Sequence, residues 1–192
     1  FNKIKRINKM EKYEKLFEVG KAQGDTNFCT VISTAVAFDK SFDEANQFLR
    51  AEAGRRFRSG PTWKNFQKAV RKLADDRGWE IKTYNSIRHN SRFSGDKTEF
   101  TIQDRFTNGE TMTVNNCLRY LNPKKRYILG VSGGGHALAV EGGKIQDWTN
   151  GRRHQVMKIM QIEGDYESPQ KPEIKPIIKK ASMSLDDMIS LL

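Results

Sequence analysis

Hydrophobic positions in the first part of the chain recur at the three- and four-residue spacing of amphipathic helices. The pattern predicts four helices, over residues 1–19, 29–39, 44–53 and 63–78. Gly20 is expected to end the first helix. Ser41 and Glu44 have the spacing of a capping box before the third helix, and Thr62 is placed to cap the fourth.

After Gly78 the pattern changes to the alternation of strands. Strands are predicted over residues 79–85, 99–106, 110–114, 126–132 and 154–164, with two more on either side of Gly142-Gly143 and a short helix over 115–121. Helices followed by strands indicate an α+β fold, in which a helical N-terminal half packs on a mostly antiparallel β-sheet.

The composition divides the chain into one folded domain and its extensions. Residues 20–164 carry most of the apolar positions, and the helix over residues 1–19 precedes them. Proline and lysine dominate residues 165–181, which is typical of a linker. Residues 182–192 have the spacing of a short amphipathic tail helix.

The segment around Cys29 carries the first candidate chemistry. Turn-forming residues 23–27 lead directly into the apolar helix, so Cys29 is predicted on or next to its first turn. Free N–H groups and the helix dipole there favour a thiolate. We expect the Gln23 amide to project toward the same point, where it and the Cys29 N–H would form an oxyanion hole. The alternative is an inert cysteine buried in a helix.

A glycine turn places a histidine and a carboxylate together further along the chain. His136 begins one predicted strand, and Asp147 lies near the end of the next, across Gly142-Gly143. In an antiparallel pair about this turn, their side chains are expected to meet as neighbours or as a diagonal pair. Asn150 is the competing partner for His136. The alternative for His136 alone is a structural histidine at a strand end.

The spacing of Gln23 and Cys29, with five residues between them and Cys29 at a helix start, resembles the active-site segment of papain-like cysteine peptidases. His136 before small and apolar residues, then a glycine turn and Asp147 beside Trp148, resembles the second half of such a site. The resemblance is to the broad clan, because papain's own Cys-Gly-Ser-Cys-Trp signature is absent. It implies a papain-like fold over roughly residues 20–163.

The resemblance also implies roles for these residues. Cys29 would be the nucleophile and His136 the base, while Asp147 orients His136 and Gln23 stabilises the oxyanion. Three residues are expected at the substrate, namely Gly134, Gly135 and Trp148. Peptide or isopeptide hydrolysis is the expected reaction, with amidase, deamidase or transglutaminase chemistry as alternatives. A small lysine-rich domain of this type resembles phage or bacterial peptidases.

Charge adds a second hypothesis. The 192-residue chain carries a formal charge of +11, which favours acidic partners, nucleic acid first and an acidic protein or surface second. Arg55-Arg56-Phe57-Arg58 is the strongest basic cluster. An inactive peptidase fold that binds nucleic acid is therefore the alternative function.

Other chemistry has little support in the sequence. No spacing of ligands predicts a metal site, no cofactor is expected, and no apolar run is long enough to cross a membrane. Two cysteines are too few for a disulfide framework, so we expect a cytoplasmic or virion-associated protein. Cys117 is expected to pack as an apolar residue, and His154 to lie on the surface without a partner.

Overall fold

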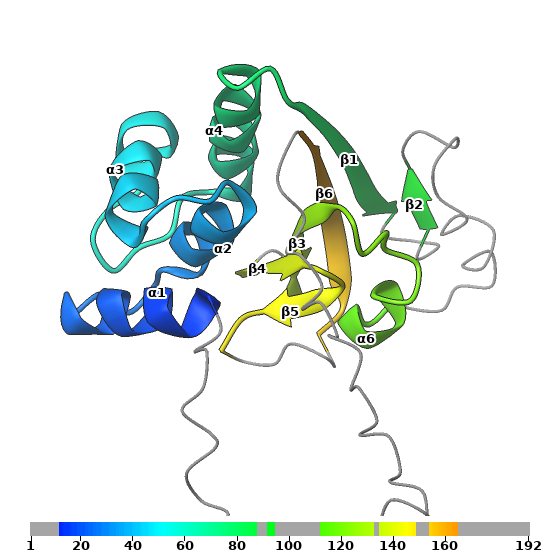
Figure 1. The fold of residues 1–192 in the computed structure, drawn as a ribbon, viewed down its shortest axis with the longest axis horizontal. Helices are drawn as coiled ribbons and strands as arrows, with labels where there is room; N and C mark the ends of the chain where they lie inside the picture. The colour runs from blue at the N-terminus through cyan, green and yellow to red at the C-terminus, as the bar shows by residue number, and fades with distance from the viewer. Residues whose placement is uncertain (1–11, 88–91, 95–111, 133–134, 149–153, 165–192) are drawn as a thin grey trace, which may run out of the picture.

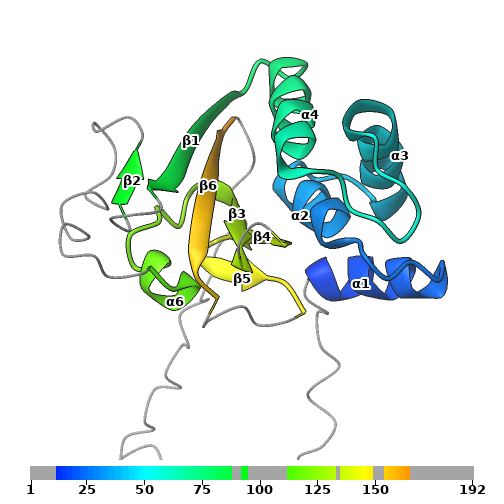
Figure 2. The same cartoon turned by 180° about the vertical axis from the view of Figure 1, so that it is seen from behind.

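The computed structural model describes residues 12–87, 92–94, 112–132, 135–148 and 154–164. These residues form an α+β fold in which helices α1 to α4 gather on one side and the antiparallel sheet lies on the other (Figure 1). The reverse view shows the same separation, with α2 next to the sheet (Figure 2). Several predicted features fall outside the described residues: Gly134, Asn150, the linker 165–181, the tail 182–192 and the strand over 99–106.

The second, third and fourth helices begin within two residues of the predicted positions, and the predicted start of the first lies outside the described residues. These helices are α1 (Lys12–Ala22), α2 (Cys29–Ala37), α3 (Phe42–Ala53) and α4 (Trp63–Asp75). The capping box of Ser41 and Glu44 is present, and Gly54 closes α3 with a φ of 65°. The Thr62 side chain accepts a hydrogen bond from the Asn65 N–H at the start of α4. Every residue of α2 is buried, as its apolar run predicts.

One predicted boundary is wrong. Gly20 does not end the first helix, because α1 continues through it to Ala22. A Cβ atom at Gly20 would lie 2.8 Å from the Phe42 ring and 3.1 Å from the Phe28 ring. The glycine is therefore required by close packing rather than by a helix end. Leu16 of α1 belongs to the same buried cluster as α2 and α3.

The six strands of the described residues form one sheet in the order β2-β1-β6-β3-β4-β5, and every neighbouring pair is antiparallel. They are β1 (Glu80–Ile87), β2 (Arg92–Ser94), β3 (Arg126–Val131), β4 (His136–Glu141), β5 (Lys144–Gln146) and β6 (Val156–Glu163). The last predicted strand takes a place between β1 and β3. Such a long-range pairing cannot be read from local sequence patterns.

Strand alternation divides the core between the two faces of the sheet. Ile128, Ala137 and Ala139 join the cluster under α1 to α4. Their neighbours Leu129 and Leu138 face a second cluster, which also contains Cys117 of the short helix α6 (Val114–Cys117). The sheet is thus covered on both faces. The small side chains of β4 on the first face let the buried helix α2 approach closely.

An ion-pair cluster ties α2 to the sheet: Arg126 at the start of β3 contacts Asp39, just after α2, and Glu141 at the end of β4.

Among the helices that the structure describes, none is long and apolar enough to cross a membrane.

Candidate active site

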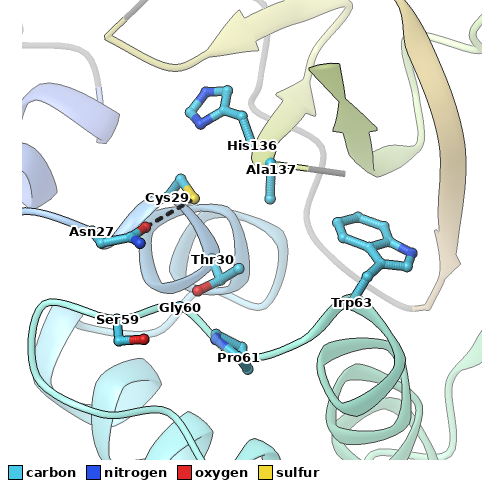
Figure 3. Close-up of a pocket in the computed structure, with 10 residues that line it drawn as sticks. Asn27, Cys29, Thr30, Ser59, Gly60, Pro61, Trp63, His136 and Ala137 are labelled. Atoms are coloured by element: carbon cyan, nitrogen blue, oxygen red, sulfur yellow. Dashed lines mark hydrogen bonds between the residues drawn. The ribbon is translucent and has the colours of Figure 1, made fainter. Parts of the chain in front are cut away.

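Cys29 and His136 meet because each is the first residue of its element. Cys29 begins α2 and His136 begins β4, and these two elements pack against each other. Cys29 lies close enough to His136 to help raise the pKa of the imidazole. Both line a pocket of about 220 Å³, together with residues of the segment 59–63 (Figure 3). The Cys29 side of the site is well shielded, since that residue is only 7% exposed.

The predicted meeting of His136 and Asp147 is confirmed. His136 Nε2 lies 3.1 Å from Asp147 Oδ2, and the Asp147 side chain is buried. Gly142 and Gly143 form the turn with φ values of 61° and 73°, which suit a tight hairpin. Ala139 pairs with Gln146. Asp147 therefore follows the paired residues directly and lies diagonal to His136.

These contacts change the charge state of His136. Burial alone disfavours an imidazolium, but the hydrogen bonds with Asp147 and Cys29 outweigh it and raise the pKa of His136 to about 9. Because Nε2 faces Asp147, Nδ1 is the ring nitrogen left for the thiol. The ring can therefore hold a proton next to Cys29 throughout the neutral pH range.

Trp148 covers the histidine rather than lining the pocket. Its ring packs edge-on against His136 at 5.3 Å between centroids and tilts against Phe28 at 5.4 Å. The indole is 36% exposed, so its outer surface faces solvent while its inner surface shields the His136 ring. Of the other residues expected at the substrate, Gly135 does line the pocket.

A buried ion pair fixes the segment that leads into Cys29. Asp25 Oδ2 accepts a hydrogen bond of 2.6 Å from Arg55 Nη2, and neither side chain is exposed beyond 1%. The same Arg55 nitrogen donates to the Asn27 carbonyl at 2.9 Å, and Asp25 Oδ1 accepts from the Asn27 N–H at 3.2 Å. Asn46 of α3 accepts from the other Arg55 nitrogen. Asn27 is thus held on both sides of its backbone.

The ion pair also sets the protonation of Asp25. Burial disfavours its carboxylate, but the hydrogen bonds from Arg55 and from the Asn27 N–H outweigh this and hold the pKa of Asp25 below its ordinary value. A depressed native pKa stabilises the fold above the unfolded pKa of about 4. That stabilisation is lost as the pH falls through the lower native value.

The Gln23 side chain does not lie where we expected. It is exposed, and its Nε2 donates to Asp43 of α3 at 2.7 Å. Asn27 takes the place beside the sulfur: its Oδ1 lies 3.9 Å from Cys29 Sγ, and it lines the pocket. Sequence reasoning missed Asn27 because a turn-forming Asn before a helix is ordinarily structural.

The remaining histidine and cysteine of the described residues behave differently from each other. The prediction that His154 has no partner is wrong, because its Nδ1 lies 2.5 Å from Ser132 Oγ and its ring lies 6.1 Å from that of His136. Cys117 is completely buried as predicted, and burial raises the pKa of its thiol to about 12. Within the described ranges, no group of three His, Cys, Asp or Glu side chains could hold a metal ion.

Comparisons with known protein families, with curated proteins and with solved structures find no match to this chain.

The ion pair between Asp25 and Arg55 yields a prediction about stability. Replacing Arg55 with Met leaves a buried carboxylate without its partner, so we expect a loss of about 3–5 kcal/mol in the free energy of unfolding. Urea denaturation at pH 7 measures it. Arg56→Met is the matched control, because Arg56 is exposed and should stay within about 0.5 kcal/mol of the parent protein. Equal effects of the two substitutions would show that the buried pair does not stabilise this segment.

Proposed function

We propose that the chain is a papain-like cysteine peptidase that hydrolyses peptide or isopeptide bonds through Cys29, His136 and Asp147. The observation that carries the proposal is the continuous chain of contacts from Cys29 through His136 to the buried Asp147, at the edge of a pocket. Each element of this chain has the chemistry that thiol acyl transfer requires: a nucleophile, a base and a group that orients the base.

The proposed reaction has two stages. The Cys29 thiolate attacks the carbonyl carbon of the substrate, and the tetrahedral intermediate collapses as His136 gives its proton to the leaving nitrogen. The products are an amine and an acyl group joined to Cys29 as a thioester. Neutral His136 then takes a proton from water, whose oxygen attacks the thioester carbon; the C–S bond breaks, the acyl group leaves as a carboxylic acid, and the thiolate–imidazolium pair is regenerated. Asp147 holds the ring in place through both stages.

Oxyanion stabilisation is assigned to Asn27 in place of Gln23. As the first residue of α2, Cys29 has a backbone N–H without an acceptor inside the helix. The amide of Asn27 lies beside the sulfur, and a half-turn of its side chain would direct Nδ2 toward the same space. Two N–H donors would then face the developing charge. To act as the oxyanion donor, the Gln23 side chain would first have to break its hydrogen bond with Asp43.

Water is the simplest acceptor for the acyl group, which is why hydrolysis is the proposed reaction.

The nucleic-acid alternative has lost part of its basis, since two arginines of the basic cluster form contacts within the protein. Arg55 is 3% exposed and paired with Asp25, and Arg58 Nε donates to the Gly24 carbonyl. Both hold the segment before Cys29, and the buried Arg55 cannot contact a phosphate group.

Alkylation of the two cysteines tests whether the proposed pair exists. With the pKa of His136 at about 9, the imidazolium next to Cys29 persists from pH 6 to about 9. The proposed thiolate–imidazolium pair predicts that Cys29 reacts with iodoacetamide at a nearly constant rate from pH 6 to 8.5. Peptide mapping by mass spectrometry measures the rates, and Cys117 serves as the buried, slowly reacting internal reference.

In His136→Ala the Cys29 rate should instead rise about tenfold for each pH unit between 6 and 8, as for an ordinary thiol. Identical pH profiles in the parent and in His136→Ala would rule out the thiolate–imidazolium pair.

Paired substitutions test the assignment of the oxyanion donor. Asn27→Ala removes a donor needed mainly in the transition state, so we expect kcat for peptide hydrolysis to fall about 100-fold with little change in KM. Gln23→Ala removes an exposed side chain that faces Asp43 and should change kcat less than about threefold. The reverse result, a large loss in Gln23→Ala and little in Asn27→Ala, would return the oxyanion role to Gln23.

A further inference from the structure

A tight turn over residues 56–59 presents an aromatic side chain to solvent. Arg56 and Ser59 form an isolated antiparallel bridge, closed by a 3.1 Å hydrogen bond from the Ser59 N–H to the Arg56 carbonyl. Phe57 and Arg58 occupy the tip. Phe57 is 49% exposed, and the Arg58 guanidinium lies 5.1 Å from the centre of its ring. Exposure of a large ring in this way forgoes hydrophobic burial and leaves the ring available to contact a partner.

The turn is held rigidly in an unfavourable backbone conformation. Arg58 has a φ of 56°, which side chains other than glycine seldom adopt. The hydrogen bond from Arg58 Nε to the Gly24 carbonyl and the burial of Arg55 anchor the turn at both ends. A fixed aromatic and its cation lose little conformational freedom when a partner binds.

The turn continues directly into the wall of the pocket. Ser59, Gly60 and Pro61 line the pocket on the side of Cys29 opposite His136 (Figure 3). In the proposed reaction His136 protonates the leaving nitrogen, so the leaving part of the substrate lies on the His136 side. The acyl part must then extend along Ser59 to Pro61 and toward Phe57.

Charge near this path is positive. Arg56 and Arg58 are exposed in the turn, and Lys158 Nζ lies 5.7 Å from the centre of the Trp63 ring, which lines the pocket. Of the described residues that line the pocket, none is an Asp or Glu. A peptide that carries a carboxylate before its scissile bond would meet complementary charge along the whole path.

We propose that the 56–59 turn is a substrate-docking surface that selects peptides with an acidic residue, next to an apolar one, a few positions before the scissile bond. Phe57 contacts the apolar side chain, and Arg56 and Arg58 pair with the carboxylate. This inference rests on the proposed peptidase function. An acidic peptide suits the turn better than a nucleic acid, because two exposed arginines neutralise few phosphates and the turn leads to Cys29.

The test compares fluorogenic peptides that differ only in bearing Asp, Gln or Lys three to five positions before the scissile bond. We expect kcat/KM to be about fivefold or more higher for Asp than for Lys, mostly through KM. Arg56→Glu should reverse this preference, and Phe57→Ala should weaken the cleavage of all peptides with an apolar neighbour. Lys144→Glu is the matched charge control, since Lys144 is exposed at the end of the β4–β5 hairpin away from His136.

Binding of the same labelled peptides to Cys29→Ala, measured by fluorescence anisotropy, separates this inference from the peptidase proposal. Binding of the Asp peptide that depends on Arg56, without cleavage by the parent protein, would support the surface and contradict the peptidase function. Cleavage of all the peptides without any charge preference would support the peptidase function and contradict the proposed surface. Equal effects of Arg56→Glu and Lys144→Glu, or Arg56-dependent binding of a single-stranded oligonucleotide in place of the peptides, would overturn the proposed surface.

Discussion

The packing of α2 against β4 is the contact on which the candidate site depends. Cys29 and His136 are the first residues of these two elements, so the distance between the sulfur and the ring is set by how closely helix and strand approach. That approach is close because the residues that face each other in the buried cluster are small, namely Ala35 of α2 and Ala137 and Ala139 of β4. Enlarging any of them would push the nucleophile away from its base.

Two sets of paired charges, of which only Asp25 and Arg55 are both buried, hold the ends of this contact. At the start of α2, Asp25 and Arg55 fix the backbone of Asn27 and thereby the entry into Cys29. At its far end, Arg126 joins Asp39 to Glu141 at the end of β4. Buried ion pairs contribute little net stability compared with apolar packing, but a geometry that separates Asp25 from Arg55 would leave a buried charge unpaired, so the pair favours the native geometry. In this protein that geometry is the one that brings the thiol to the histidine.

The sequence predicted the local parts of this arrangement because each depends on residues close together in the chain. The start of α2 at Cys29, the capping box at Ser41 and the glycine turn that brings Asp147 to His136 all follow from short-range chemistry. Long-range features escaped prediction. The sequence shows Arg55 only as part of a basic cluster, and its pairing with Asp25, 30 positions earlier, appears only in three dimensions. The helix end assigned to Gly20 failed for the same reason, since the ring of Phe42 decides it.

Trapping of an acyl-enzyme is the measurement that tests the account most directly. The protein is mixed with an activated ester of a short peptide at pH 6, quenched with acid within seconds, digested and mapped by mass spectrometry. The account predicts one acyl group on Cys29 and none on Cys117, with the Cys29 adduct strongly diminished in His136→Ala. Acylation confined to lysine side chains, or equal labelling of Cys29 with and without His136, would contradict a thiol acyl-transfer site at the meeting of α2 and β4.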